Sequence, residues 1–456
     1  MQFKKAQRQR FVQGLRSVLD QTDMFANIYV AEDCAPLFDG LVGRLEKADQ
    51  EALATFVSDR PLYQFVSEFL YNRLLSHHER HPLRTPLSAL SGLDLDALAE
   101  EITVAIESLP WSYAFAIGVP IGGGLPKSFV WLLGDGVALV RGAKAAALFR
   151  KNMTPPPQSK LLSLFPETGQ PPVHLLVGVQ GFVNVHEGTR PYFLGMDRLK
   201  ALLGLMMAIR MVDYAPEWDR EEASVRIGIC LRQPDGVYEH VETGLFGRAD
   251  SNTVTGLINN LSPDLTSPET WGKTVGSHIS AIRRVMEADQ ATRDRILLGA
   301  QWFFESQSGD NDLLRFVQTM VCLEILVGEE LKGDQPKLGI SELIRNRVAY
   351  LIGRDMAERN HILETFGAIY KVRSEIVHRG QARLSKAEAD YHRTLREYCV
   401  RVIQAEIALL SAGDEWADDF WLDDLLNRAA LDPMTDVFDP PIDLDAMFGA
   451  FSEDEA

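Results

Sequence analysis

The sequence has 456 residues, of which 46% are hydrophobic and 24% are charged, and its formal net charge is −18. A chain of this length can form two or three domains, and this composition is ordinary for globular proteins. Because no apolar run reaches the ~18 residues of a membrane span and the basic N-terminus has no signal-peptide core, we expect a cytoplasmic protein outside the membrane.

The negative charge is concentrated at one end of the chain. Residues 413–456 hold 14 Asp and Glu against the single Arg428, a net of −13, which leaves −5 for residues 1–412. Residues 341–400 hold 11 Lys and Arg against 8 Asp and Glu, a net of +3. The overall charge therefore does not exclude a nucleic-acid ligand for that region.

The four cysteines are far apart in the sequence and form no C-x-x-C pair. This spacing does not favour a zinc cluster, and we expect reduced, mostly buried thiols and no cofactor.

Residues 1–110 are predicted to form a helical region. Apolar residues recur with helical spacing in residues 11–19 and 62–74. A further helix is predicted over residues 94–108, where Pro110 would stop it.

Residues 111–250 are predicted to form a small mixed α/β domain, and residues 251–289 a linker or helical connection. Two hairpins are predicted, around Gly134-Asp135-Gly136 and Pro234-Asp235-Gly236. Residues 154–157 are predicted to be a proline-rich loop. The expected strands are residues 129–133, 137–140, 173–185, 225–231 and 237–241, and the expected helix is 196–211.

Residues 290–412 are predicted to form an all-α bundle, followed by an acidic tail over residues 413–456. A capping box, Ser385 with Glu388, opens the last helix, and Glu324 is predicted to pair with an arginine in a structural or a catalytic role. The expected helices are residues 296–304, 313–327, 341–352, 356–379 and 386–410. The fold class is therefore predicted to be α+β and multidomain.

The end of the 356–379 helix carries three residue types suited to phosphodiester chemistry. Arg373, Ser374 and His378 supply a fixed cation, a hydroxyl and a titratable imidazole within about one and a half turns. Histidine can transfer protons near neutral pH, and the arginine fork can bind phosphate oxygens. Since one histidine cannot easily be both base and acid in one turnover, the pattern predicts a dimer.

This pattern resembles the signature of HEPN domains, small helical bundles with an Arg-x4-6-His motif, and in particular the ApeA-like HEPN family. The resemblance covers about residues 290–412. It rests on five blocks in order: residues 302–306, 323–328, 340–353, Arg359, and the motif stretch 370–380.

The resemblance implies a metal-independent RNA endonuclease with a dimeric Arg-x4-His site, acting in prokaryotic antiviral defence. Arg373, His378 and Ser374 would be catalytic, Arg359 and Arg379 would bind substrate, and residues 1–290 would sense a trigger or protein partner. The alternative is a non-catalytic HEPN module that binds RNA, nucleotide or protein as a sensor or adaptor. In that case Arg373 and His378 are an ordinary salt-bridged arginine and a helix-end histidine, and Ser374 is a helix serine that bonds back to its own backbone.

Two other patterns are weaker. In the run His77-His78-Glu79-Arg80-His81 the spacing is one residue short of H-E-x-x-H, so no metal site is predicted. Residues 118–128 loosely resemble a phosphate loop, but Pro126 replaces the glycine that such a loop requires beside its lysine. A nucleotide site is therefore not expected there.

Overall fold

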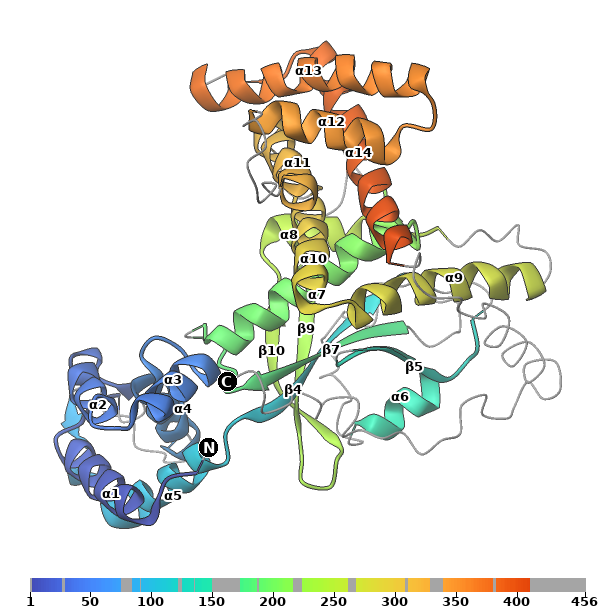
Figure 1. Ribbon diagram of the computed structural model, residues 1–456. Coiled ribbons are helices and arrows are strands. Elements are labelled where there is room, and N and C mark those ends of the chain that lie inside the picture. The colour runs from blue at the N-terminus through green and yellow to red at the C-terminus, as the bar shows by residue number, and fades with distance from the viewer. Residues whose placement is uncertain are drawn as a thin grey trace. The chain divides into compact units, whose positions relative to one another are not determined.

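The computed structural model describes thirteen segments of the chain, shown as ribbon in Figure 1. They are residues 2–26, 29–74, 84–90, 92–121, 125–134, 136–149, 173–186, 188–215, 224–260, 268–307, 311–328, 339–379 and 383–410. The protein is a mixed α/β structure that divides into two compact units. Among the described residues, the first contains residues from 1–114 and 178–195, and the second contains residues from 115–177 and 196–410.

The first unit is mainly helical, as the sequence predicts. Its helices are α1 Lys5–Asp20, α2 Ala35–Val42, α3 Lys47–Phe56, α4 Pro61–Leu74 and α5 Leu95–Glu107. The apolar residues that define the predicted helices, among them Phe11, Leu15 and Phe65, are buried in one core. Asp94 caps α5 by accepting from the backbone N–H groups of Asp96 and Ala97.

The first unit also contains a small sheet that the sequence analysis did not predict. Its strands are β1 Asp23–Phe25, β2 Tyr29–Val30 and β3 Thr85–Pro86, paired antiparallel in the order β2-β1-β3. Strands of two or three residues are too short to produce a recognisable alternation of polar and apolar residues.

The second unit contains most of a six-stranded sheet in the order β10-β9-β4-β7-β6-β5. The strands are β4 Trp111–Val119, β5 Phe129–Gly134, β6 Val137–Arg141, β7 Val173–Gly181, β9 Arg226–Arg232 and β10 Tyr238–Leu245. Both predicted hairpins are confirmed: β5 pairs with β6 and β9 with β10, each antiparallel.

Other elements of this unit differ from the sequence prediction. The strand predicted over residues 173–185 ends at Gly181, which has a φ of 134°. The helix predicted over 196–211 is α7 Arg190–Ala208, which starts earlier and stops before the left-handed Arg210. Strand β4 was not predicted, because residues 113–117 are buried in succession and lack a period-two pattern. The remaining elements are α6 Gly142–Leu148, β8 Val212–Tyr214, α8 Arg248–Thr255, β11 Leu257–Asn259 and α9 Pro268–Glu287.

All five predicted C-terminal helices are confirmed. They are α10 Gln290–Glu305, α11 Asp312–Val327, α12 Ile340–Ile352, α13 Met356–Arg379 and α14 Lys386–Leu409. The predicted capping box opens α14, with Ser385 and Glu388 bonded in both directions. Helix α13 packs on α11, α12 and α14 (Figure 1). The sheet and this bundle belong to one compact unit, and the domain boundary at residue 290 stays a prediction.

The Thr154–Pro157 loop, the acidic tail and Gly380 lie outside the described residues. Within the described segments, no helix combines the length and apolar content needed to cross a bilayer.

Candidate functional site

The three predicted catalytic residues lie on the last two turns of α13. Arg373 and Ser374 are partly buried, whereas His378 is exposed in the last turn, where the helix ends at Arg379. Ile362, Phe366, Ile369 and Val372 are buried and anchor α13 to the bundle. The apolar positions of this helix therefore hold the motif on a rigid element.

Arg373 has two partners within the bundle. Its Nη2 lies 3.5 Å from Glu324 Oε1 on α11, and its guanidinium carbon lies 5.7 Å from the centre of the Tyr370 ring. This confirms that Glu324 pairs with an arginine of the bundle. About a quarter of each side chain in this pair is exposed, at 26%. The guanidinium is thus pre-positioned but still reaches solvent.

Part of the Arg373 side chain has no hydrogen-bond partner. Its Nε is buried and unbonded within the described segments. A buried N–H without an acceptor is costly. The exposed 26% of the side chain, and not this buried Nε, is therefore the part that an anionic ligand from solvent can reach.

His378 and Arg373 do not face the same side of α13. Five residues at about 100° each turn the helix by roughly 140° between the two positions, whereas Ser374 and His378 are four apart and share a face. Within one chain, His378 and Arg373 therefore lie on different faces of α13.

The two predicted substrate-binding arginines lie at opposite ends of α13. Arg379 is 78% exposed, next to His378, and its Nη1 is 3.5 Å from Glu375 Oε1. Arg359 is fourteen residues before Arg373, about 21 Å along the axis. Its Nε donates to the Gly353 carbonyl at 3.2 Å, and its guanidinium lies over the exposed Tyr350 ring at 5.2 Å. Only Arg379 is therefore close to the motif within one chain.

Two arginines that were not identified from the sequence support the end of α11. Arg295 Nη1 and Arg347 Nη1 donate to the Leu326 and Val327 carbonyls at 2.5 and 2.6 Å. Cations at a helix C-terminus are favoured by its dipole. These contacts fix the end of the helix that carries Glu324. Arg347 lies inside a block that carries the family resemblance, but its target could not be read from the sequence.

The weaker patterns do not add a site among the described residues. The histidine run 77–81 and the three glycines 122–124 lie outside them. In the part of the chain that the structure describes, no three His, Cys, Asp or Glu residues are grouped to hold a metal ion. Pro126 and Leu125 instead accept hydrogen bonds from the buried Arg141 guanidinium, at 3.3 and 3.2 Å.

No protein-family model, curated protein or solved structure matches this chain. The resemblance to HEPN domains therefore stays a prediction that rests on the quoted residues.

Proposed function

We propose that this chain is a metal-independent HEPN-type endoribonuclease of the ApeA-like family, whose active site combines the Arg-x4-His motifs of two copies. The observation that carries the proposal is the arrangement on α13, with Arg373 held by Glu324 and Tyr370 and His378 exposed at the helix end.

The proposed reaction is an internal transfer at the RNA phosphate. The ribose 2′-oxygen attacks phosphorus as its proton passes to one His378 imidazole, and the bond from phosphorus to the 5′-oxygen breaks. The imidazolium of the second copy's His378 donates the proton that the leaving 5′-oxygen needs. The products are a 2′,3′-cyclic phosphate and a 5′-hydroxyl.

Arg373 would stabilise the charge that grows on the phosphate. Its planar fork can bind two phosphate oxygens, and 26% of its side chain is exposed to an incoming ligand. Ser374, on the same face as His378, would hydrogen-bond to the substrate, and Arg379 would contact a neighbouring phosphate.

Two copies are needed because the motif of one chain is split around its helix. The roughly 140° between Arg373 and His378 leaves each face of α13 with only part of the chemistry. An antiparallel pair of α13 helices would place Arg373 of one copy beside His378 of the other. Val377, which is 49% exposed between these residues, would be covered in such a pair.

In this proposal RNA is the substrate, the protein is a homodimer through the bundle, and cleavage serves antiviral defence in the cytoplasm. Arg359 would contact RNA away from the cleaved bond. Residues 1–290 would sense the trigger or a protein partner.

One observation favours a second candidate, a non-catalytic HEPN module that binds RNA, nucleotide or protein. Arg373 already has an acidic partner in the isolated chain, so the Arg373–Glu324 contact can serve the bundle alone. A module of this kind would bind ligands without cleaving RNA.

The two candidates differ in a direct cleavage assay. We expect single-stranded RNA to be cleaved in excess EDTA at an undiminished rate, with 2′,3′-cyclic phosphate ends identified by mass spectrometry. Cleavage that stops in EDTA and returns with Mg²⁺ would reject the mechanism. RNA binding with no cleavage by the full-length dimer would support the non-catalytic module.

A further inference from the structure

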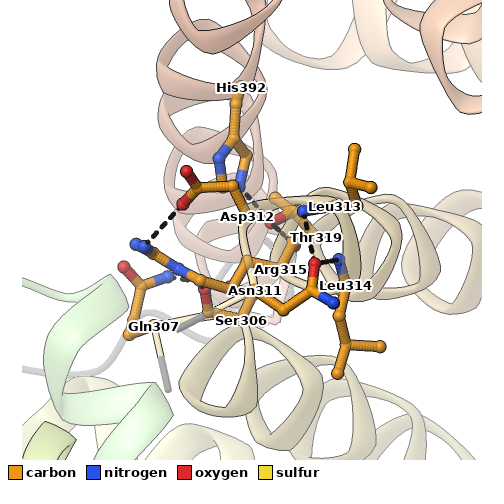
Figure 2. A network of polar contacts seen from close by, with 9 residues as sticks. All are labelled: Ser306, Gln307, Asn311, Asp312, Leu313, Leu314, Arg315, Thr319 and His392. Carbon is orange, nitrogen blue, oxygen red and sulfur yellow. Dashed lines mark hydrogen bonds and ion pairs between the residues drawn. The ribbon is translucent and has the colours of Figure 1, made fainter. Parts of the chain in front are cut away.

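A second group of basic side chains lies at the other end of α11, far from the motif. Arg315 is in the first turns of α11, and His392 and Arg396 are one turn apart on α14. Figure 2 shows Arg315, Thr319 and His392 together, with Ser306 and Asp312 beside them. Arg315 is nine residues before Glu324, about 13 Å along the helix axis. The group is therefore separate from the Glu324–Arg373 contact.

His392 is fixed in this group as a neutral imidazole. It is only 7% exposed, its Nε2 lies 3.1 Å from Thr319 Oγ1, and its ring centre is 5.5 Å from that of Phe316. Burial and the nearby Arg315 and Arg396 guanidiniums lower the pKa of His392 to about 3. Both guanidiniums therefore oppose protonation of this imidazole.

The acidic groups nearby compensate these cations only in part. Arg315 bonds to Asp312 Oδ1 at 3.2 Å and to the Ser306 carbonyl at 3.1 Å (Figure 2). Asp312 is 65% exposed, so solvent screens its charge. The neighbouring Glu397 pairs with Arg210 at 3.0 Å and faces that cation instead.

Arg396 has no hydrogen bond or ion pair with any residue that the structure describes, and its Nε is buried. Burial and the adjacent Arg315 lower its pKa, whereas Tyr214, Asp213 and Cys399 act in the opposite direction. A buried cation without a hydrogen-bonded anion is costly to the fold. An oxyanion between the two guanidiniums would satisfy the donors and remove the repulsion.

We propose that Arg315 and Arg396 bind a phosphate group between α11 and α14. The ligand class is a tetrahedral oxyanion, either free phosphate or a phosphomonoester on a larger molecule. The two planar guanidiniums can donate hydrogen bonds to its oxygens, and the neutral imidazole of His392 lies beside them without adding charge. The backbone N–H groups that begin α11 are not part of the site, because Asn311 Oδ1 already accepts from Leu313 and Leu314.

The test measures anion binding by the full-length chain and does not involve RNA cleavage. Isothermal titration and thermal unfolding would compare sodium phosphate with sodium chloride at equal ionic strength and pH 7. Phosphate should raise the melting temperature where chloride does not, and Arg396→Gln should bind phosphate about tenfold more weakly. Adenosine monophosphate serves as a second probe. Tighter binding of this probe assigns the site to phosphomonoesters, and tighter binding of phosphate assigns it to the free anion.

Arg393→Gln is the matched control, because Arg393 is on the same helix but is 79% exposed and pairs with Asp390. It should keep the wild-type affinity for phosphate. Arg396→Lys retains the charge without the fork and should give intermediate binding, which separates recognition from folding. Equal phosphate binding by the wild type and Arg396→Gln, or no phosphate-specific stabilisation of the wild type, would overturn the proposal.

Discussion

Contacts within the bundle hold the Arg373 side chain in place but leave part of it accessible to a ligand. Its contacts with Glu324 and Tyr370 restrict its rotamers, yet a quarter of the side chain remains exposed and its Nε is unbonded in the described segments. Replacing the carboxylate with a phosphate would exchange one ion pair for another of higher charge. The side chain has therefore already lost conformational entropy before any ligand binds.

At the residue scale, His378→Ala and Arg373→Ala should each abolish RNA cleavage, and the arginine change should also weaken RNA binding. The matched controls are His361→Ala and Lys371→Ala, exposed residues of the same helix. Circular dichroism should show an unchanged fold for all four variants. A mixture of the two inactive variants should not regain full activity, because every mixed dimer still lacks groups. Full cleavage by His378→Ala would show that His378 is not a catalytic residue.

His392 leads to a prediction about acid stability. Its pKa is about 3 in the folded chain, below its ordinary value. The unfolded chain takes up this proton first as the pH falls, so the free energy of unfolding should decrease from about pH 6.5 downward. Between pH 7.5 and 5 the loss should be about 2 kcal/mol.

Urea denaturation in chloride buffers at both pH values measures this loss. His392→Gln should remove the histidine's part of the pH dependence, whereas the exposed His361→Gln should not. Identical pH profiles for the wild type and His392→Gln would show that this imidazole does not titrate as described.

At the element scale, close packing of α7 on α10 depends on one glycine. A Cβ at Gly204 would lie 1.9 Å from the Ala300 carbonyl oxygen, whereas a Cβ at Gly367 on α13 would meet nothing within 4 Å. Backbone atoms cannot move aside without separating the helices. Gly204→Ala should therefore destabilise the protein by about 3 kcal/mol, and Gly367→Ala should stabilise it by up to about 1 kcal/mol.

Equilibrium unfolding in urea compares the two substitutions directly, since both replace a helical glycine by alanine. Equal effects would mean that helix propensity alone, and not the approach to Ala300, determines the outcome at Gly204.

The elements that could be predicted from sequence are those with a strong local pattern. The apolar spacing of the five bundle helices, the Ser385 capping box and the two Gly-containing turns each appear directly in the residues. Strand β4 and the short strands of the first unit carry no such pattern. The sequence predicted that Glu324 pairs with an arginine of the bundle. It could not identify that arginine as Arg373, because this requires knowing which face of α13 packs against α11.

The group around Arg396 could not have been found from sequence. Arg315 is 77 residues before His392 and lies on a different helix from His392 and Arg396, and surface arginines are common on helices. The packing of α11 on α14, seen in the contacts of Thr319 with His392 and with Cys399, brings them together. Long-range proximity of this kind depends on the tertiary fold.

At the scale of the whole molecule, the distribution of charge matters more than its total. Residues 413–456 carry 14 Asp and Glu against one Arg, directly after the helix that completes the bundle. This segment lies outside the described residues, so its role is argued from sequence alone. An acidic segment that follows a basic region in the chain can compete with other polyanions for that region. The alternative is a tail that only improves solubility.

Removal of residues 432–456, which deletes eight carboxylates and no basic residue, should tighten RNA binding at low salt and have less effect at high salt. The reason is that added salt screens the competition between the tail and RNA phosphates. Fluorescence anisotropy with a labelled single-stranded RNA measures both affinities. A matched full-length variant with these eight residues changed to Asn or Gln should behave like the truncated chain, because the charge and not the length is proposed to act. RNA affinity that is the same with and without the charged tail at low salt would disprove the role of the tail.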